Sequence, residues 1–222
     1  MGQLIFVVAK SGMGKSTSLR NLNPDETVIV NTDQKPLPFP KSKELYSEEK
    51  GNYIKSSDTT KVLNRLKQAH KEPKIKTFVI DTWSRVMTDF IMSGAFRSST
   101  GFDKWNNLSG SQYDLLNTIN EKVRDDLNVY LFAHPETIQD ENGFLRERIA
   151  VQGKQLEKFA PESFSSVVLY AEIKASPGKP NEHIFRTRNS GADTCKTPMG
   201  MFEDAEISND LVLVNEAVNA YF

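Results

Sequence analysis

Four short apolar runs, separated by segments with helical periodicity, most constrain how this chain can fold. The runs are LIFVVA (4–9), TVIVN (27–31), KTFVID (76–81) and NVYLFAH (128–134). Each run is apolar at successive positions, which is typical of strands buried between two layers of helices. Alternation of strands and helices favours right-handed crossovers and parallel pairing. The sequence therefore predicts an α/β fold with a mostly parallel central sheet flanked by helices.

The segments between and after these runs extend this prediction. Behind a cap at Asp58, Val62 and Ala69 follow helical spacing, and residues 109–127 show a similar pattern. The tail 209–222 predicts a closing helix. Residues 165–173 and 182–188 are predicted as late antiparallel strands, joined by the Pro-Gly segment KASPGKPN. At 222 residues, the chain is expected to form a single domain over 1–222.

Two longer connections are predicted as loops, at 34–52 and 93–112. Loops of this length are uncommon unless they carry function or are mobile. Composition adds the broad setting: a net charge of −1 gives no global attraction to nucleic acid, and no apolar run is long enough to cross a membrane. The lone Cys195 excludes an internal disulfide, so a cytoplasmic protein is expected.

The stretch FVVAKSGMGKSTSL (6–19) nearly matches the phosphate-binding pattern G-x-x-x-x-G-K-[ST], with Ala9 in place of the first glycine. In such a loop, successive backbone N–H groups surround phosphates, and Gly12 and Gly14 supply the required freedom. Lys15 would reach the β and γ phosphates and Ser16 would ligate Mg²⁺. The candidate nucleotide-binding residues, called here the phosphate loop, are Ala9, Lys10, Ser11, Gly12, Met13, Gly14, Lys15, Ser16 and Thr17.

A phosphate loop needs an acid at the end of a neighbouring buried strand to help hold the metal. Asp81, the last residue of KTFVID, meets this requirement. The alternative for Asp81 is an ordinary aspartate in a turn after the strand. Taken together, the loop and Asp81 predict binding of ATP with Mg²⁺, with GTP as the alternative nucleotide.

Four further residues are candidates for hydrolysis. Asp33, just past the second strand, could orient the attacking water, and His134 could sense the γ-phosphate at the end of the fourth strand. Arg186 and Arg188 share one face of a late strand and could contact the phosphates of a neighbouring subunit. Each has a plainer alternative: a turn aspartate, a packed histidine and a solvated strand face.

The order of these motifs resembles the RecA-like ATPase core. More narrowly, VVAKSGMGKST, VIDTWS, LFAHPE and RTRNSGADTCKTPMGMF resemble small phage RecA-like single-strand annealing proteins, grouped with phage nucleotide-binding proteins of the AAA type. The resemblance implies a homo-oligomer, as a ring or short filament, in which Arg186 and Arg188 act across the subunit boundary. It also places Asp33 where RecA enzymes carry a longer glutamate, which predicts slow hydrolysis.

The resemblance further implies contact with single-stranded DNA through loops at residues 93–112 and 135–158, and an interaction with a single-strand DNA-binding protein as a further candidate. Aromatic rings can stack on bases while cations contact phosphates. A local aromatic core under a long loop is the alternative for the aromatic residues. The candidate DNA-binding residues are Phe96, Arg97, Phe102, Lys104, Trp105, Arg146, Arg148 and Lys154.

Two other functions remain open at the sequence level. KSGMGKS also resembles the phosphate loops of MinD and ParA proteins, nucleotide-switched dimers in which a lysine at the offset of Lys10 crosses to the partner's nucleotide. In that family a glycine stands where this chain has Ser11. The second alternative is a small-molecule kinase, although no arginine-rich lid is evident.

Overall fold

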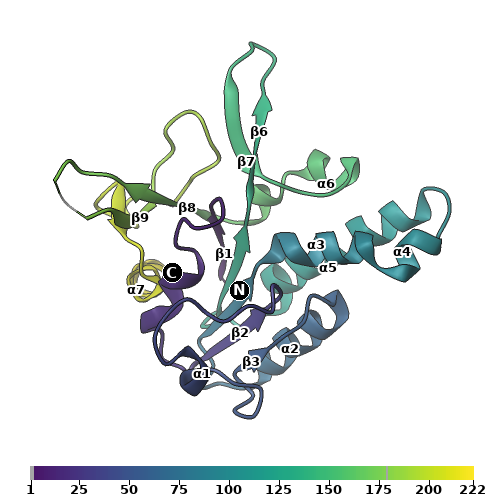
Figure 1. Ribbon diagram of the computed structural model, residues 1–222, viewed down its shortest axis with the longest axis horizontal. Coiled ribbons are helices and arrows are strands. Elements are labelled where there is room, and N and C mark those ends of the chain that lie inside the picture. Colours follow the sequence, from purple (N-terminus) through teal and green to yellow (C-terminus); the bar gives the residue numbers. More distant parts are fainter. Residues whose placement is uncertain (1–2, 179) are drawn as a thin grey trace.

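The computed structural model describes residues 3–178 and 180–222, and its main feature is an eight-stranded sheet (Figure 1). The strands follow the order β10-β9-β8-β1-β5-β4-β2-β3, and β6 pairs separately with β7. All pairs from β8 to β3 are parallel, whereas β9 and β10 are antiparallel to their neighbours. The strands are β1 (Gln3–Val8), β2 (Thr27–Asn31), β3 (Tyr53–Ile54), β4 (Thr77–Asp81), β5 (Asn128–Ala133), β6 (Pro135–Gln139), β7 (Leu145–Ile149), β8 (Val167–Lys174), β9 (Glu182–Arg186) and β10 (Glu206–Ser208).

Helices cover both faces of this sheet, which confirms the predicted fold class. The helices are α1 (Ser42–Leu45), α2 (Thr59–Lys71), α3 (Trp83–Met92), α4 (Gly94–Ser98), α5 (Asp103–Lys122), α6 (Lys154–Phe159) and α7 (Leu211–Tyr221), with short 3₁₀ helices η1 (Ser16–Asn21) and η2 (Pro161–Phe164). The expected cap of α2 is present, because the Asp58 side chain accepts a hydrogen bond from the Lys61 N–H. The closing helix is also where the sequence predicts it.

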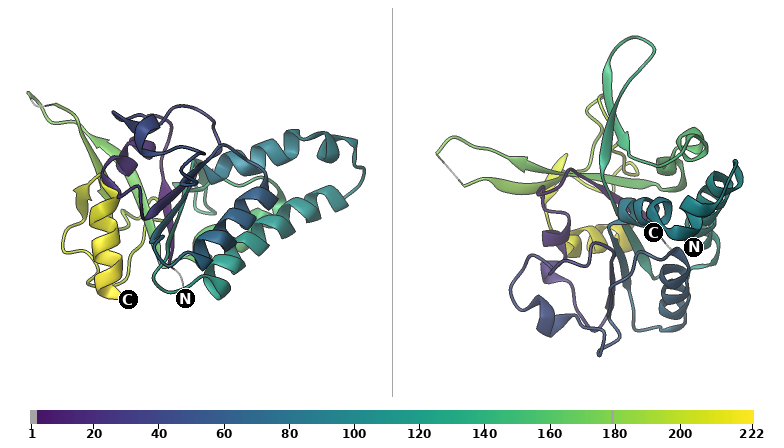
Figure 2. Two further views of the ribbon diagram at one scale, coloured as in Figure 1. Left: turned by 90° about the horizontal axis from the view of Figure 1, so that it is seen from below. Right: turned by 45° about the vertical axis from the view of Figure 1, so that its right-hand side comes forward.

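Alternate residues of the central strands enter two different cores. Leu4, Phe6 and Val8 of β1 pack in the core that includes α2, α3 and α5, while Ile5 and Val7 pack in the core that includes α7. Figure 2 shows α7 on one side of the sheet and α2 and α5 on the other. Burying one such side chain contributes about 1.5–3 kcal/mol, so a strand buried on both faces is strongly fixed in place.

Two segments predicted as loops are regular structure instead. Residues 93–112 contain α4 and the first half of α5, and 135–158 contain the β6–β7 hairpin and the start of α6. The hairpin projects away from the main sheet (Figure 1). Its strands are half-buried or exposed at all but one position, so they lack the apolar alternation that reveals a buried strand in a sequence.

The parallel strands bring their carboxyl ends to one edge of the sheet, as in other open α/β folds. Phosphate-loop residues follow β1, Asp33 follows β2, Asp81 ends β4 and His134 follows β5. The outermost strands are short, with two residues in β3 and three in β10. Among the described residues, no helix combines the length and apolar character needed to cross a membrane.

Candidate nucleotide-binding site

A cavity of about 410 Å³ opens at the carboxyl edge of the sheet and is called here the main cavity. Its lining comes from the phosphate loop and from the ends of β2, β4 and β5, with one residue from β9. The lining residues are Ser11, Gly12, Gly14, Lys15, Ser16, Thr17, Asn31, Asp33, Lys35, Pro36, Leu37, Pro38, Asp81, Thr82, His134 and His183.

The phosphate loop has the conformation that its glycines predict. Gly12 and Gly14 have φ angles of 85° and 98°, in the region that glycine adopts without a steric penalty. The loop leads into η1, a six-residue 3₁₀ helix, where the sequence predicts an ordinary helix. Ala9, Lys10 and Met13 do not line the main cavity, although they were expected at the nucleotide; they line a neighbouring cavity instead.

Lys15 lies at the centre of the site and is only 6% exposed. Its Nζ donates hydrogen bonds to the carbonyl oxygens of Ala9 and, at 3.1 Å, Lys10. Burial lowers the pKa of Lys15 to about 8, against the attraction of Asp81 and Asp33. The ammonium group is therefore desolvated and bound by loop carbonyls, and the charges of Asp81 and Asp33 favour its protonated form.

Ser16 and Asp81 are in direct contact, although they come from different elements. The Ser16 side chain hydrogen-bonds to the Asp81 carboxylate, which is 5% exposed. Burial raises the pKa of Asp81 to about 6, and the bond from Ser16 opposes this rise. The hydroxyl and the acid expected to hold a metal thus meet at one point in the main cavity.

The donor set fits Mg²⁺ held together with nucleotide phosphates. Among the described residues, no group of three or more histidine, cysteine, aspartate or glutamate side chains forms a metal cluster. Magnesium in nucleotide sites commonly uses one or two protein oxygens, with phosphates and water supplying the rest. The buried hydroxyl of Thr82, which lines the same cavity, has no hydrogen-bond partner among the described residues. Ser16, Asp81 and Thr82 together offer suitable oxygen atoms.

The position of Asp33 is fixed by Asn31, which the sequence reading did not single out. The Asn31 Nδ2 donates to the Lys35 carbonyl and to the Tyr53 hydroxyl, both at 2.6 Å, and its Oδ1 accepts from the Gln34 N–H. These bonds shape the turn that carries Asp33 into the main cavity. Asn31 belongs to no phosphate-loop motif, so only its location at the end of a buried strand could have indicated this role.

His134 lies beside the phosphate loop, as the sequence predicts. Its Nδ1 is 3.1 Å from the Ala9 carbonyl oxygen and 3.4 Å from the Lys15 Nζ. Its backbone N–H donates to the Ser84 hydroxyl of α3 at 2.9 Å. Burial lowers the pKa of His134, and the Lys15 charge acts in the same direction. A neutral imidazole in this place can link the loop to β6, which begins at the next residue.

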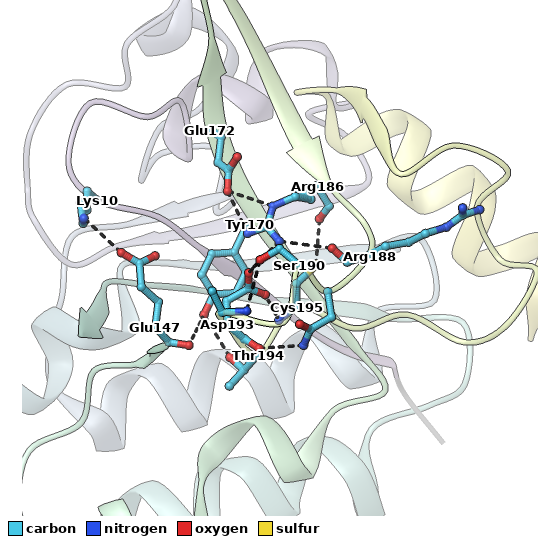
Figure 3. A network of polar contacts seen from close by, with 12 residues as sticks. Lys10, Glu147, Tyr170, Glu172, Arg186, Arg188, Ser190, Asp193, Thr194 and Cys195 are labelled. Carbon is cyan, nitrogen blue, oxygen red and sulfur yellow. Dashed lines mark hydrogen bonds and ion pairs between the residues drawn. The ribbon is translucent and has the colours of Figure 1, made fainter. Parts of the chain in front are cut away.

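The Lys10 side chain points out of the main cavity and toward the hairpin (Figure 3). Its Nζ forms an ion pair of 3.1 Å with Glu147 of β7, and the Lys10 side chain is 65% exposed. The Glu147 carbonyl in turn accepts a hydrogen bond from the Tyr170 hydroxyl of β8. Lys10 therefore connects the phosphate loop to the hairpin within its own chain.

The late arginines differ from one another, whereas the sequence treats them as a pair (Figure 3). Arg186 is bound by Asp193 at 2.7 Å and Glu172 at 2.9 Å, and it lies over the Tyr170 ring. The Arg186 guanidinium is therefore engaged inside its own chain, and its contact with a neighbouring subunit stays a prediction. Arg188 is exposed, and it donates to the Glu203 carbonyl at 2.6 Å.

The aromatic residues expected to stack on DNA form a small core. Phe96 is 7% exposed and packs edge-to-face with Phe90 and Trp105, and the Lys104 Nζ lies over the Phe96 ring, 5.1 Å from its centre. Base stacking by Phe96 is therefore corrected to packing between α3, α4 and α5, whereas Trp105 is half-buried and its stacking on a base stays a prediction. Phe102 is 84% exposed.

The cations of the hairpin region are largely paired, while others face solvent. Arg146 pairs with Asp140 at 2.8 Å, and Arg148 pairs with Glu136 at 2.7 Å. Arg97 and Lys154 are exposed. Ion pairing reduces the positive potential that Arg146 and Arg148 could present to a phosphate backbone.

Comparison with known proteins agrees with this geometry. A family model described as the AAA domain matches residues 1–198. The chain belongs to the AAA-domain family. With its phosphate loop and Asp81, this AAA-domain protein is a P-loop ATPase. Among solved structures, it is similar to the KaiC-like protein PH0186 from the hyperthermophilic archaeon Pyrococcus horikoshii OT3, at 12% identity and a TM-score of 0.48, over 83% of this chain and 77% of that chain. No curated protein sequence matches it.

Proposed function

We propose that this AAA-domain protein binds and hydrolyses Mg·ATP, and that ATP binding controls contact with single-stranded DNA during strand annealing or recombination of the phage type. The observation that carries the nucleotide part is the placement of Ser16 and the buried Asp81 in one cavity with the buried Lys15. The phosphate loop follows one strand of the sheet and Asp81 ends another, so this arrangement brings the two parts of the predicted metal site together.

Different residues of the chain have different roles in binding and hydrolysing the nucleotide. Lys15 and the loop N–H groups bind the phosphates, while Ser16 and Asp81 would hold Mg²⁺. When bound, Mg²⁺ neutralises charge on the phosphate oxygens. Asp33 lies where a carboxylate can orient a water molecule, and its side chain is 34% exposed. The short side chain and its exposure favour slow hydrolysis.

The proposed contact with single-stranded DNA is supported by the family resemblance and by the positions at which the α3–α5 region and the β6–β7 hairpin begin. The α3–α5 region follows β4, and the hairpin follows β5, so both start beside the main cavity. The links between the cavity and the hairpin are His134 and the Lys10–Glu147 ion pair. This pairing inside the chain also favours the DNA-dependent ATPase over the nucleotide-switched dimer.

Calorimetry with Mg·ATP tests the nucleotide part, with Lys15→Ala as the disabled variant and Lys67→Ala, an exposed lysine of α2, as the matched control. We expect Lys15→Ala to weaken binding by more than about tenfold, or 1.4 kcal/mol, and the control to bind like the wild type. Equal affinity of the two variants would refute the assignment of the main cavity.

Single-strand binding and ATPase rate test the DNA part. The affinity for a single-stranded oligonucleotide should rise with ATP and fall linearly with salt on logarithmic axes, by about 0.7 per phosphate contact. The ATPase rate should rise when the same strand is added. Binding that does not depend on nucleotide, with an unstimulated rate, would leave a P-loop ATPase without this DNA role.

A further inference from the structure

A second cavity, of about 380 Å³, lies beside the main cavity. The two share Lys35, Pro36 and Leu37, so they lie on opposite sides of one short stretch of chain. The rest of the lining comes from the segment between β2 and α2. The residues around the second cavity are Gln34, Lys35, Pro36, Leu37, Ser42, Lys43, Tyr46, Ser47, Glu48, Tyr53 and Lys55.

The charge of this lining is strongly positive for a chain whose net charge is −1. Lys35, Lys43 and Lys55 contribute three ammonium groups, against the single carboxylate of Glu48. Among the described residues, the ammonium groups of Lys43 and Lys55 have no ion-pair partner, and that of Lys35 is 4.0 Å from Asp33. Such a local excess of one sign in a concave surface attracts anions.

The floor of the second cavity is preformed. Leu37, Tyr46 and Tyr53 are each less than 9% exposed. The Tyr46 hydroxyl donates to the Leu22 carbonyl, which fixes the ring, and the Tyr53 hydroxyl accepts from Asn31. An apolar base with a few polar groups around it is typical of small-ligand sites, whose volumes start at about 300 Å³.

The Asn31 side chain connects the two cavities. It bonds both to Tyr53, in the floor of the second cavity, and to the turn that carries Asp33 into the main cavity. A ligand that contacts Lys35 and Tyr53 therefore lies next to the carboxylate assigned to hydrolysis.

We propose that the second cavity binds the phosphate of a nucleotide unit, supplied either by a free mononucleotide or by one residue of a single strand. Compact ammonium groups are suited to phosphate as point charges, and the apolar floor suits the remainder of a nucleotide. This proposal rests on the proposed function in one respect, namely that the neighbouring main cavity is the ATP-binding site. It places a second phosphate-bearing ligand beside the ATP-binding one.

The test compares the double variant Lys43→Glu/Lys55→Glu with a control, Lys67→Glu/Lys71→Glu. The control reverses the charge of two exposed lysines of α2. Both pairs are introduced into the Lys15→Ala chain, so that the main cavity does not contribute. The probes are AMP and a labelled thymidine oligonucleotide of about 12 nucleotides, a length within the usual range for one strand-binding domain. Thermal unfolding verifies that both variants fold alike.

We expect Lys43→Glu/Lys55→Glu to weaken binding of one or both probes by about tenfold relative to the α2 control. For the oligonucleotide, the salt slope should also fall by about 1.4, for two phosphate contacts. Loss of AMP binding alone would identify a free mononucleotide as the ligand, and loss of oligonucleotide binding would identify a strand. Equal affinities in both variants, or no binding of either probe to the Lys15→Ala chain, would overturn the proposal.

These outcomes are separate from those for the main cavity, because that cavity is tested by Mg·ATP calorimetry on the chain with Lys15 intact. Failure of ATP binding there, with the AMP or oligonucleotide effect present, would remove the proposed function and keep the second site. The reverse result would keep the ATPase and remove the second site.

Discussion

At the scale of single residues, Gly14 is closely approached by two side chains that are distant in sequence, those of His183 and Asn209. A Cβ atom added there would lie 2.9 Å from the His183 Nδ1 and 3.3 Å from both side-chain amide atoms of Asn209. Asn209 is 1% exposed, and among the described residues its amide atoms have no hydrogen-bond partner. Because His183 of β9 and Asn209, just before α7, approach Gly14 so closely, glycine is the residue that fits this position of the phosphate loop.

Gly14→Ala and Gly12→Ala therefore form a matched pair. Both residues have positive φ, which costs an alanine about 1–2 kcal/mol, but only Gly14 has neighbours within 4 Å of an added Cβ. We expect Gly14→Ala to lose about 1–3 kcal/mol more stability in urea unfolding, and more Mg·ATP affinity. His183→Ala should restore part of the loss. Equal effects at the two glycines would contradict this packing.

Cys195 provides a second prediction at this scale. Its thiol is buried, donates to the Arg186 carbonyl at 3.2 Å, and burial raises its pKa to about 12. Because the reactive form is the thiolate, iodoacetamide at pH 8 should label the folded chain very slowly and the urea-unfolded chain rapidly. Mass spectrometry measures both rates, and rapid labelling of folded protein would show that the thiol is accessible.

At the scale of secondary-structure elements, the buried parallel strands were predictable and the exposed elements were not. The runs 27–31 and 128–134 are apolar at successive positions because both faces of their strands are covered, so the pattern alone reveals them. The hairpin strands have mixed polar sequences such as LRERI, which provide no such signal. The residues of the site follow the same division: Lys15 and Ser16 belong to a known spacing and Asp81 ends a recognisable buried strand, whereas Asn31, Thr82 and His183 belong to no motif.

A prediction at this scale concerns Arg186, the last residue of the β9 strand. Arg186 and Asp193 form an ion pair in which the side chains are 15% and 4% exposed. Removing one partner of a buried pair leaves an uncompensated charge, so Arg186→Ala should lower the free energy of unfolding by about 3 kcal/mol. Arg188→Ala, at an exposed residue, should change it by less than about 0.5 kcal/mol. Chemical denaturation measures both values, and similar values would argue that Arg186 has no structural role.

At the scale of the whole molecule, the exposed Arg188 is the more accessible of the two arginines predicted to act across a subunit boundary. If it acts there, mixing Lys15→Ala and Arg188→Ala chains should restore part of the ATPase rate, since some boundaries then combine an intact phosphate loop with an intact arginine. The rate of the mixture is compared with the mean of the separate rates. A mixture that co-assembles by size-exclusion chromatography and shows no recovery would assign Arg188 to its own chain.

The short outer strands of the sheet limit how copies of this molecule can join. An edge strand attracts other chains by offering a row of free backbone donors and acceptors, and β3 and β10 offer only two and three residues. Continuing the sheet from one molecule into the next is therefore disfavoured at both margins. At these two margins, any ring or filament would depend on contacts between side chains, and those contacts can be strengthened or weakened one substitution at a time without disturbing the fold.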